Sequence, residues 1–236
     1  MRKAMKRVLL IGAIIIVILL GASGSYVFTL LSMTPVKTGQ ILNTNIYAVN
    51  DTFSAIYFIN TNAGYIVIDA GTNAKKVEAS IKEAGINTND VKWLLLTHSD
   101  SDHVAALTLF PNAKIYMSKD ELPLLNGTMK RHPLGGNSLP GGIDFNKVSL
   151  LSNDEELFFS GIRIKCIEAP GHTIGSMLYF IDDKYLFTGD AFKVKNGKKN
   201  VHPFTMDAKQ AEKTIERVNE AITGSYTILT GHYGVH

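Results

Sequence analysis

The segment from Thr97 to His103 restricts the fold of this chain more than any other stretch. It has the sequence Thr-His-Ser-Asp-Ser-Asp-His and follows six residues, 91–96, that are apolar except for Lys92. A run of this length and composition predicts a buried strand. A strand that ends and turns here would direct the polar side chains around one point, whereas a continuous strand would alternate them between two faces.

Four side chains of this segment could bind a metal ion: His98, Asp100, Asp102 and His103. Imidazole and carboxylate groups are the ligands that zinc and harder divalent ions take in proteins. The sequence therefore predicts a metal site at the end of the strand. The alternative is a polar loop in which Ser101 or Asp102 accepts backbone N–H bonds at the start of the next helix.

Four other short motifs place glycine close to Asp or His: Asp69-Ala70-Gly71, Gly171-His172, Gly189-Asp190 and Gly231-His232. Together with the first segment, and in this order, they resemble the metallo-β-lactamase superfamily from about residue 40 to residue 236. The resemblance implies an α/β fold, the αββα sandwich, with a metal site at one edge of its two sheets. The usual second motif is His-x-His-x-Asp-His, and here Asp100 replaces the middle His.

The resemblance also implies the ligands of two metal ions. Site one would consist of His98, Asp100 and His172; site two would consist of Asp102, His103 and His232; Asp190 would bridge them. Asp69 would support the metal loop without binding metal, or serve as the N-cap of the following helix, and both roles are compatible.

A metal-dependent hydrolase is the function that this ligand set implies. A hydroxide bridging two divalent ions would attack an ester, lactone, thioester or amide bond of a small-molecule substrate, and Asp102 would be the catalytic residue that orients it. Zinc is the expected metal, although the carboxylate of Asp100 shifts the preference toward iron or manganese. Tyr233, His132 and the neighbouring Arg131 are candidates for substrate contact.

Three alternatives remain open at this point. A phosphodiesterase or nuclease would use the same metals, a surface module could bind metal without turnover, and a diiron centre could do redox chemistry. Residues 2–7 carry four cations, and removing them from the formal charge of +3 leaves −1 for the rest of the chain. This charge does not support nucleic-acid binding.

The N-terminal residues predict contact with a membrane. The four cations of residues 2–7 precede residues 8–31, which carry no charge. Such a segment is a signal peptide or an uncleaved transmembrane anchor, and the rest of the chain is expected to be secreted or extracytoplasmic. We therefore divide the chain into an N-terminal signal or anchor at 1–31, a linker at 32–39 and a hydrolase domain at 40–236.

The rest of the domain alternates predicted strands and helices, as in layered α/β proteins. Two helices with an apolar stripe are expected at 73–84 and 208–223, the second with Asp207 as N-cap. Antiparallel meanders are expected at 41–69 and 147–168, a hairpin around Asn196-Gly197, and a long irregular loop at 118–146.

Overall fold

The computed structural model describes residues 27–41, 43–132 and 143–236. Residues 34–236 form one compact unit. Residues 27–31 are helical, but most of the predicted signal or anchor segment lies outside the described residues. Within the described ranges, no helix is both long and apolar enough to cross a membrane. The membrane segment therefore stays a prediction.

The larger sheet has seven strands in the order β1 to β7. The strands are β1 (Gly39–Gln40), β2 (Ile46–Asp51), β3 (Ser54–Thr61), β4 (Gly64–Ile68), β5 (Val91–Leu95), β6 (Lys114–Ser118) and β7 (Val148–Leu151). Strands β1 to β4 pair antiparallel, whereas β4 to β7 pair parallel. In the parallel half, strand ends that are distant in sequence reach the same edge of the sheet.

The smaller sheet has five strands in the order β14-β11-β10-β9-β8. They are β8 (Glu156–Phe159), β9 (Ile162–Glu168), β10 (Met177–Ile181), β11 (Tyr185–Gly189) and β14 (Thr227–Thr230). Only the β11–β14 pair is parallel. A separate hairpin of β12 (Lys193–Lys195) and β13 (Lys198–Asn200) turns at Asn196-Gly197, as predicted. Both turn residues have positive φ, which Asn and Gly tolerate best.

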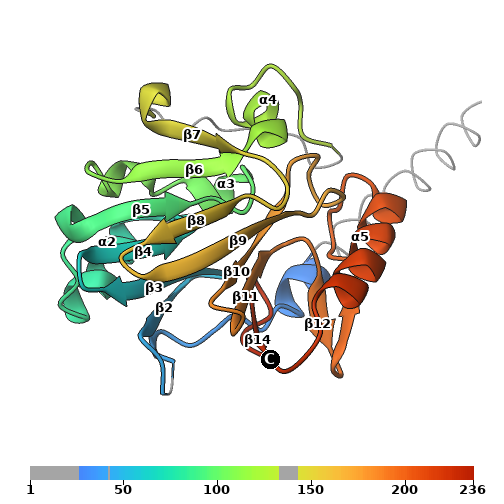
Figure 1. Cartoon of the computed structure of the whole chain (residues 1–236), viewed down its shortest axis with the longest axis horizontal. Coiled ribbons are helices and arrows are strands. Elements are labelled where there is room, and N and C mark those ends of the chain that lie inside the picture. The colour runs from blue at the N-terminus through green and yellow to red at the C-terminus, as the bar shows by residue number, and fades with distance from the viewer. Residues whose placement is uncertain (1–26, 42, 133–142) are drawn as a thin grey trace, which may run out of the picture. The chain divides into compact units, whose positions relative to one another are not determined.

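The helices cover the outer faces of the two sheets (Figure 1). Helix α2 (Ala74–Glu83) packs Val77 and Ile81 on the larger sheet, and α5 (Ala208–Ala221) packs Val218 on the smaller one. A third apolar cluster lies between the sheets and includes Tyr57 of β3 and Tyr179 of β10. The predicted αββα sandwich is confirmed.

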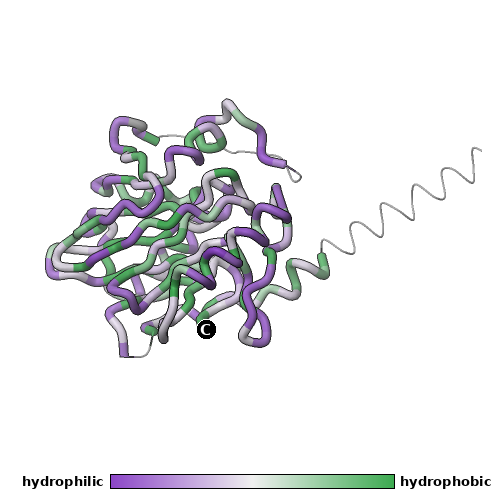
Figure 2. The backbone as a smooth tube through the Cα atoms, turned by 45° about the vertical axis from the view of Figure 1, so that its right-hand side comes forward, coloured by the Kyte–Doolittle hydropathy of each residue, from purple (hydrophilic) through white to green (hydrophobic). Residues whose placement is uncertain are grey.

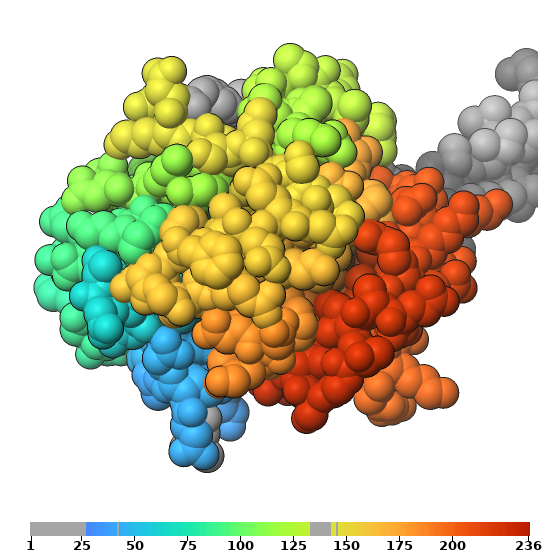
Figure 3. Space-filling model, in the orientation of Figure 1, coloured from blue at the N-terminus to red at the C-terminus, as the bar shows by residue number. Residues whose placement is uncertain are grey.

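Shorter helical segments connect the strands. These are η1 (Thr88–Asp90), α3 (Ser101–Val104), η2 (Leu107–Leu109), η3 (Lys119–Glu121), α4 (Leu122–Leu125) and η4 (Phe145–Lys147). In Figure 2 the apolar residues are concentrated along the strands. Figure 3 shows β8 and β9, in yellow, and α5, in red, on the viewed face together with segments from other parts of the chain.

Two predictions about the strands and helix caps are wrong. Residues 147–151 were expected in the second meander, but β7 pairs parallel with β6 in the larger sheet. Strand pairing depends on tertiary contacts that a local pattern does not contain. The N-cap of α2 is Asn73, which accepts the backbone N–H of Lys76 at 3.2 Å, so Asp69 does not cap this helix. Asp207 does cap α5, accepting from the N–H of Gln210 at 3.0 Å.

Candidate metal centre

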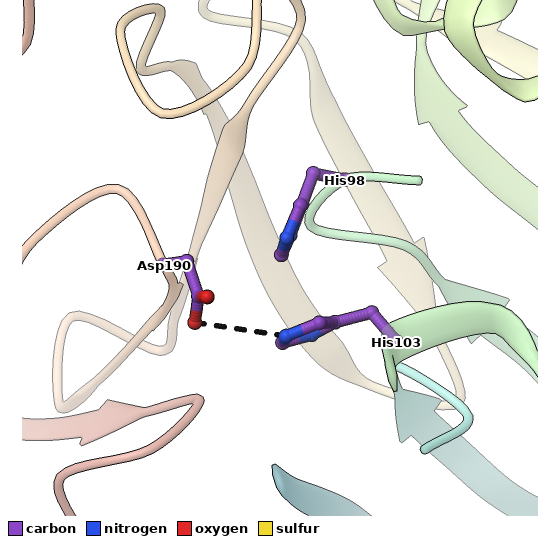
Figure 4. Close-up of side chains that lie close together, drawn as sticks. All are labelled: His98, His103 and Asp190. Atoms are coloured by element: carbon purple, nitrogen blue, oxygen red, sulfur yellow. Dashed lines mark ion pairs between the residues drawn. The ribbon is translucent and has the colours of Figure 1, made fainter. Parts of the chain in front are cut away.

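Four strand ends deliver the predicted ligands to one place. The segment after β5 carries residues 98–103, β9 leads to His172, β11 to Asp190, and β14 to His232. Figure 4 shows His98, His103 and Asp190 pointing toward a common centre, with Asp190 Oδ1 3.6 Å from His103 Nε2. The sandwich therefore places side chains from distant parts of the sequence around one point.

All seven predicted metal ligands belong to this centre. Each of the following groups has its potential ligand atoms within 4.8 Å of one another: His98, Asp100 and His172; Asp102, His103 and His232; His98, His103 and Asp190; and His172, Asp190 and His202. The first two groups are the predicted site one and site two. Asp190 occurs in both of the others, as a bridging position requires.

Unpartnered polar atoms support metal binding here. Among the described residues, the Nε2 atoms of His98 and His103 and the Oδ1 atom of Asp190 are buried without a hydrogen-bond partner. Buried polar atoms in proteins nearly always have a partner. Imidazole nitrogen and carboxylate oxygen are ligands of zinc, manganese and iron, so this donor set fits divalent metal ions.

Two hydrogen-bond acceptors orient the histidines of site two by binding Nδ1, on the side of each ring that faces away from the centre. His103 Nδ1 donates to Asp69 Oδ2 at 2.8 Å, and His232 Nδ1 donates to the carbonyl oxygen of Phe53 at 2.7 Å. These bonds select the tautomer whose Nε2 lone pair faces the centre. His232 Nε2 consequently lies 3.2 Å from Asp102 Oδ2 and 3.0 Å from Asp190 Oδ2.

Asp69 is buried beneath the metal loop and has a positive φ of 61°. Its Oδ1 accepts the backbone N–H of Thr97 at 2.8 Å, and its Oδ2 accepts the Thr97 hydroxyl at 2.8 Å as well as His103. Asp69 therefore holds both ends of the segment that carries the first four ligands. A conformation this uncommon persists only where the surroundings enforce it.

The side chain of Arg131 places a positive charge next to site one. The Arg131 guanidinium is almost fully buried and donates from Nε to Asp100 Oδ1 at 2.8 Å and from Nη2 to Asp100 Oδ2 at 3.0 Å. His172 Nε2 lies 3.1 Å from the same Asp100 Oδ2. The carboxylate that departs from the usual motif thus has an arginine partner 31 residues away in sequence.

Glu121 and His202 belong to the site, although sequence analysis did not select them. Glu121 is fully buried and accepts from Ser99 N at 2.7 Å and from Thr173 Oγ1 at 2.7 Å, so it joins the loops that carry His98 and His172. The His202 ring lies 5.0 Å from that of His172. In sequence, both were single polar residues without a motif.

The electrostatics separate the two sites. Burial opposes protonation of His103, but Asp69, Asp102 and Asp190 outweigh it and raise the pKa of His103 to about 9. Burial opposes ionisation of Asp102, but His103 and His232 outweigh it and lower its pKa to about 2. Burial lowers the pKa of His172.

The candidates for substrate contact lie in different environments. Tyr233 is mostly buried, with its ring 5.6 Å from that of His202 and 5.9 Å from the Lys193 ammonium. His132 is exposed and belongs to none of the groups of possible metal ligands. Tyr233 is therefore beside the centre, whereas His132 is not.

The fold and the site together define a class of protein: an αββα sandwich whose strand ends carry a His and Asp metal centre. The chain belongs to the metallo-beta-lactamase superfamily, whose profile matches residues 49–232. It is a metal-dependent hydrolase of that superfamily.

Known relatives agree with this assignment. The chain is 26% identical to a probable metallo-hydrolase of Methanocaldococcus jannaschii, with 72% of this chain and 71% of the relative covered. It is 28% identical to a hydroxyacylglutathione hydrolase of Erwinia tasmaniensis, with 75% and 60% covered. The subclass B3 metallo-β-lactamase BJP-1 of Bradyrhizobium japonicum superposes with a TM-score of 0.67 at 19% identity, covering 85% and 79%. At that identity the superposition shows the fold alone.

Proposed function

We propose that this protein hydrolyses the ester, lactone, thioester or amide bond of a small molecule. The observation that carries the proposal is the convergence of seven His and Asp side chains from four strand ends, with unpartnered atoms facing one centre. Two divalent ions bound there, which we expect to be zinc, would polarise the scissile carbonyl and lower the pKa of the attacking water.

The residues around the centre have separate roles in this proposal. His98, Asp100 and His172 would hold one ion, Asp102, His103 and His232 would hold the other, and Asp190 would be shared by both. Asp102 also acts as the catalytic carboxylate, since its pKa of about 2 keeps it ionised at neutral pH and its side chain is 21% exposed. It would orient the attacking water, accept its proton and return that proton to the leaving group.

Two observations favour acyl chemistry. A relative that covers 75% of this chain is named a hydroxyacylglutathione hydrolase. The chain beyond residue 7 carries a formal charge of −1, which does not attract a polyanionic substrate. Tyr233 is proposed to contact the substrate because it lies beside the centre, and His132 is the weaker candidate.

Phosphodiester hydrolysis is the second candidate. Asp100 adds negative charge to site one and thereby favours harder ions such as manganese or iron. The ammonium of Lys193 lies 5.9 Å from the Tyr233 ring and could attract a phosphate. This candidate would replace the first if manganese and not zinc supported turnover.

The test uses the full chain, purified in detergent and loaded in parallel with zinc or manganese. The panel contains thioesters, lactones, carboxylic esters, a β-lactam and an activated phosphodiester. Acyl turnover that disappears on chelation and returns with zinc is the expected result. Turnover of the phosphodiester alone would overturn the acyl proposal, and no turnover despite bound metal would favour a non-catalytic metal-binding module.

We also propose that residues 1–31 direct the hydrolase domain out of the cytoplasm, either as an anchor or as a cleaved signal. The proposal is based on four cations followed by 24 uncharged residues. Protease added to intact cells should degrade an anchored domain, and a secreted domain should appear in the medium. Protection of the domain until the cells are lysed would contradict both versions.

A further inference from the structure

Arg131 occupies a position that hydrolysis by two equivalent metal ions does not explain. Its side chain is only 5% exposed, and its guanidinium has hydrogen-bond acceptors on several sides. Nη2 donates to the carbonyl oxygen of Phe204 at 2.8 Å, and Nη1 donates to the carbonyl oxygen of His132. These contacts involve no predicted metal ligand and hold the cation beside site one.

The Arg131 guanidinium lies within hydrogen-bond distance of the atoms that would bind a metal ion in site one. Arg131 Nη2 lies 3.0 Å from Asp100 Oδ2 and 3.2 Å from His172 Nε2. The same two atoms lie 3.1 Å from each other, and His172 Nε2 lies 3.6 Å from Asp190 Oδ2, so both atoms face the centre. An N–H bond directed at a lone pair excludes a metal from that lone pair. Arg131 therefore donates to Asp100 and approaches the ligand atom of His172, which are two of the three ligands of site one.

Among the residues that the structure describes, no arginine or lysine contacts the ligands of site two in this way. Its histidines donate hydrogen bonds from Nδ1, the nitrogen that faces away from the centre, to Asp69 and to the Phe53 carbonyl. The charge near its ligands is negative, because Asp69, Asp102 and Asp190 lie next to His103. A divalent cation is attracted to this site, whereas the fixed positive charge of Arg131 repels one from site one.

We propose that Arg131 competes with metal for Asp100 and His172, so that the protein binds its two ions in order, tightly at site two and weakly at site one. The weak ion exchanges with its surroundings, and Arg131 thereby sets the metal concentration at which the two-metal form exists. This inference rests on the metal centre of the proposed function, but it does not depend on which bond is cleaved.

Substitutions at Arg131 distinguish competition from simple support of the ligands. Arg131→Met removes the charge and leaves the Asp100 carboxylate without a cation, so competition predicts that the second metal binds about tenfold tighter or more. If Arg131 only orients the ligands, its removal should weaken binding by about 10- to 100-fold. The two explanations thus predict changes of opposite sign.

The experiment is a competition titration of metal-free protein with zinc against a fluorescent chelator. Wild type should show two dissociation constants that differ by about tenfold or more, and crystals with one zinc equivalent should show anomalous density at Asp102, His103 and His232. Arg131→Met should bring the two constants together. Arg131→Lys keeps the positive charge but loses the planar guanidinium with its several N–H donors, so the difference between its two dissociation constants should be intermediate. This variant keeps the inference testable if Arg131→Met does not fold.

Arg163→Met is the matched control, because Arg163 is also ion-paired, with Glu156 and Asp183, but belongs to the surface of β9. Its zinc constants should equal those of wild type. Equal affinity for both ions in wild type, or weaker binding of the second ion in Arg131→Met, would overturn the inference while leaving a two-metal hydrolase intact. Wild type that binds no zinc at all would overturn the proposed function as well.

Discussion

The two proposed metal sites consist of the same residue types, two histidines and one aspartate each, but their surroundings differ. At site two, acceptors lie behind the histidines, and the neighbouring carboxylates Asp69 and Asp190 provide negative charge. At site one, a buried guanidinium donates to Asp100 and approaches His172. The comparison teaches that identical ligand sets are made unequal by the groups that hydrogen-bond to them.

Asp190→Ala should have the largest effect, because Asp190 is the carboxylate that the two sites share. Its Oδ2 lies 3.0 Å from His232 Nε2 and 3.6 Å from His172 Nε2. We expect metal binding at both sites and hydrolytic activity to fall by more than about 100-fold, beyond the effect of losing a group that only orients a ligand. Elemental analysis of the purified variant measures the metal, with the exposed Asp120→Ala as control. A folded variant that retained both equivalents would show that Asp190 does not bridge.

Asp69→Asn should weaken site two more than site one. The substitution keeps the size of the side chain but removes the charge that accepts the His103 Nδ1 proton. We expect zinc affinity at site two to fall by about 10- to 100-fold. Asp51→Asn is the control, since Asp51 is also fully buried and accepts two backbone N–H groups, from Thr72 and Asn73 at 2.6 Å. An equal loss of zinc affinity in both variants would make the effect one of general destabilisation.

Glu121→Gln should act on the side of site one. The four groups that donate to Glu121 are Ser99 N, Ser99 Oγ, Thr173 Oγ1 and Gly175 N. A glutamine can accept hydrogen bonds through one oxygen only. Its NH2 group would face buried donors, which would then lack an acceptor. We expect the free energy of unfolding of the metal-free protein to fall by about 1–3 kcal/mol, measured by urea titration. Glu156→Gln, at a partly exposed residue paired with Arg163, should change it by less than about 1 kcal/mol.

The pH dependence of metal binding should also separate the sites. The raised pKa of His103, about 9, means that this histidine holds a proton at neutral pH in the metal-free protein, and metal must displace it. Burial opposes protonation of His232, the other histidine of site two, but Asp190 and Asp102 outweigh it and raise its pKa as well. Apparent affinity at site two should therefore rise with pH, by about tenfold per unit for each proton displaced, and the contribution of His103 should level off above about pH 9. At site one, burial lowers the pKa of His172, so this ligand is already neutral and should add no such slope.

Calorimetric titration in two buffers of different ionisation enthalpy counts the protons released by each ion. Release of more protons with the first, tighter ion than with the second is the expected result. The same release from both ions would mean that the two sites do not differ in protonation.

Much of this site could be predicted from local sequence. Residues 98–103 directly follow a buried strand, and Gly171, Gly189 and Gly231 mark the other strand ends. Gly231 shows why the motif needs glycine, because a Cβ atom there would lie 2.4 Å from Asp190 Oδ1. The ligands were therefore recognisable from residue type, order and position relative to the strands.

The partners of those ligands were not predictable in the same way. Glu121 and His202 carry no local pattern, and Arg131 had been considered only for substrate contact. The assignment of residues 147–151 to the second meander failed for the same reason, since β7 pairs with β6 through contacts made across the sheet. Residues that act through a distant partner cannot be identified from their sequence neighbours.

The sequence by itself determined the superfamily, the layered α/β fold and the identity of the candidate ligands, because these depend on short motifs and on the periodicity of apolar residues. Only the tertiary structure decided what surrounds each ligand. It set Asp69 behind His103 and Arg131 against Asp100, and these contacts depend on how strand ends and loops meet at the edge of the sandwich. Because charge at short range in a buried site strongly changes ligand affinity, the difference between the two sites is a property of the folded chain.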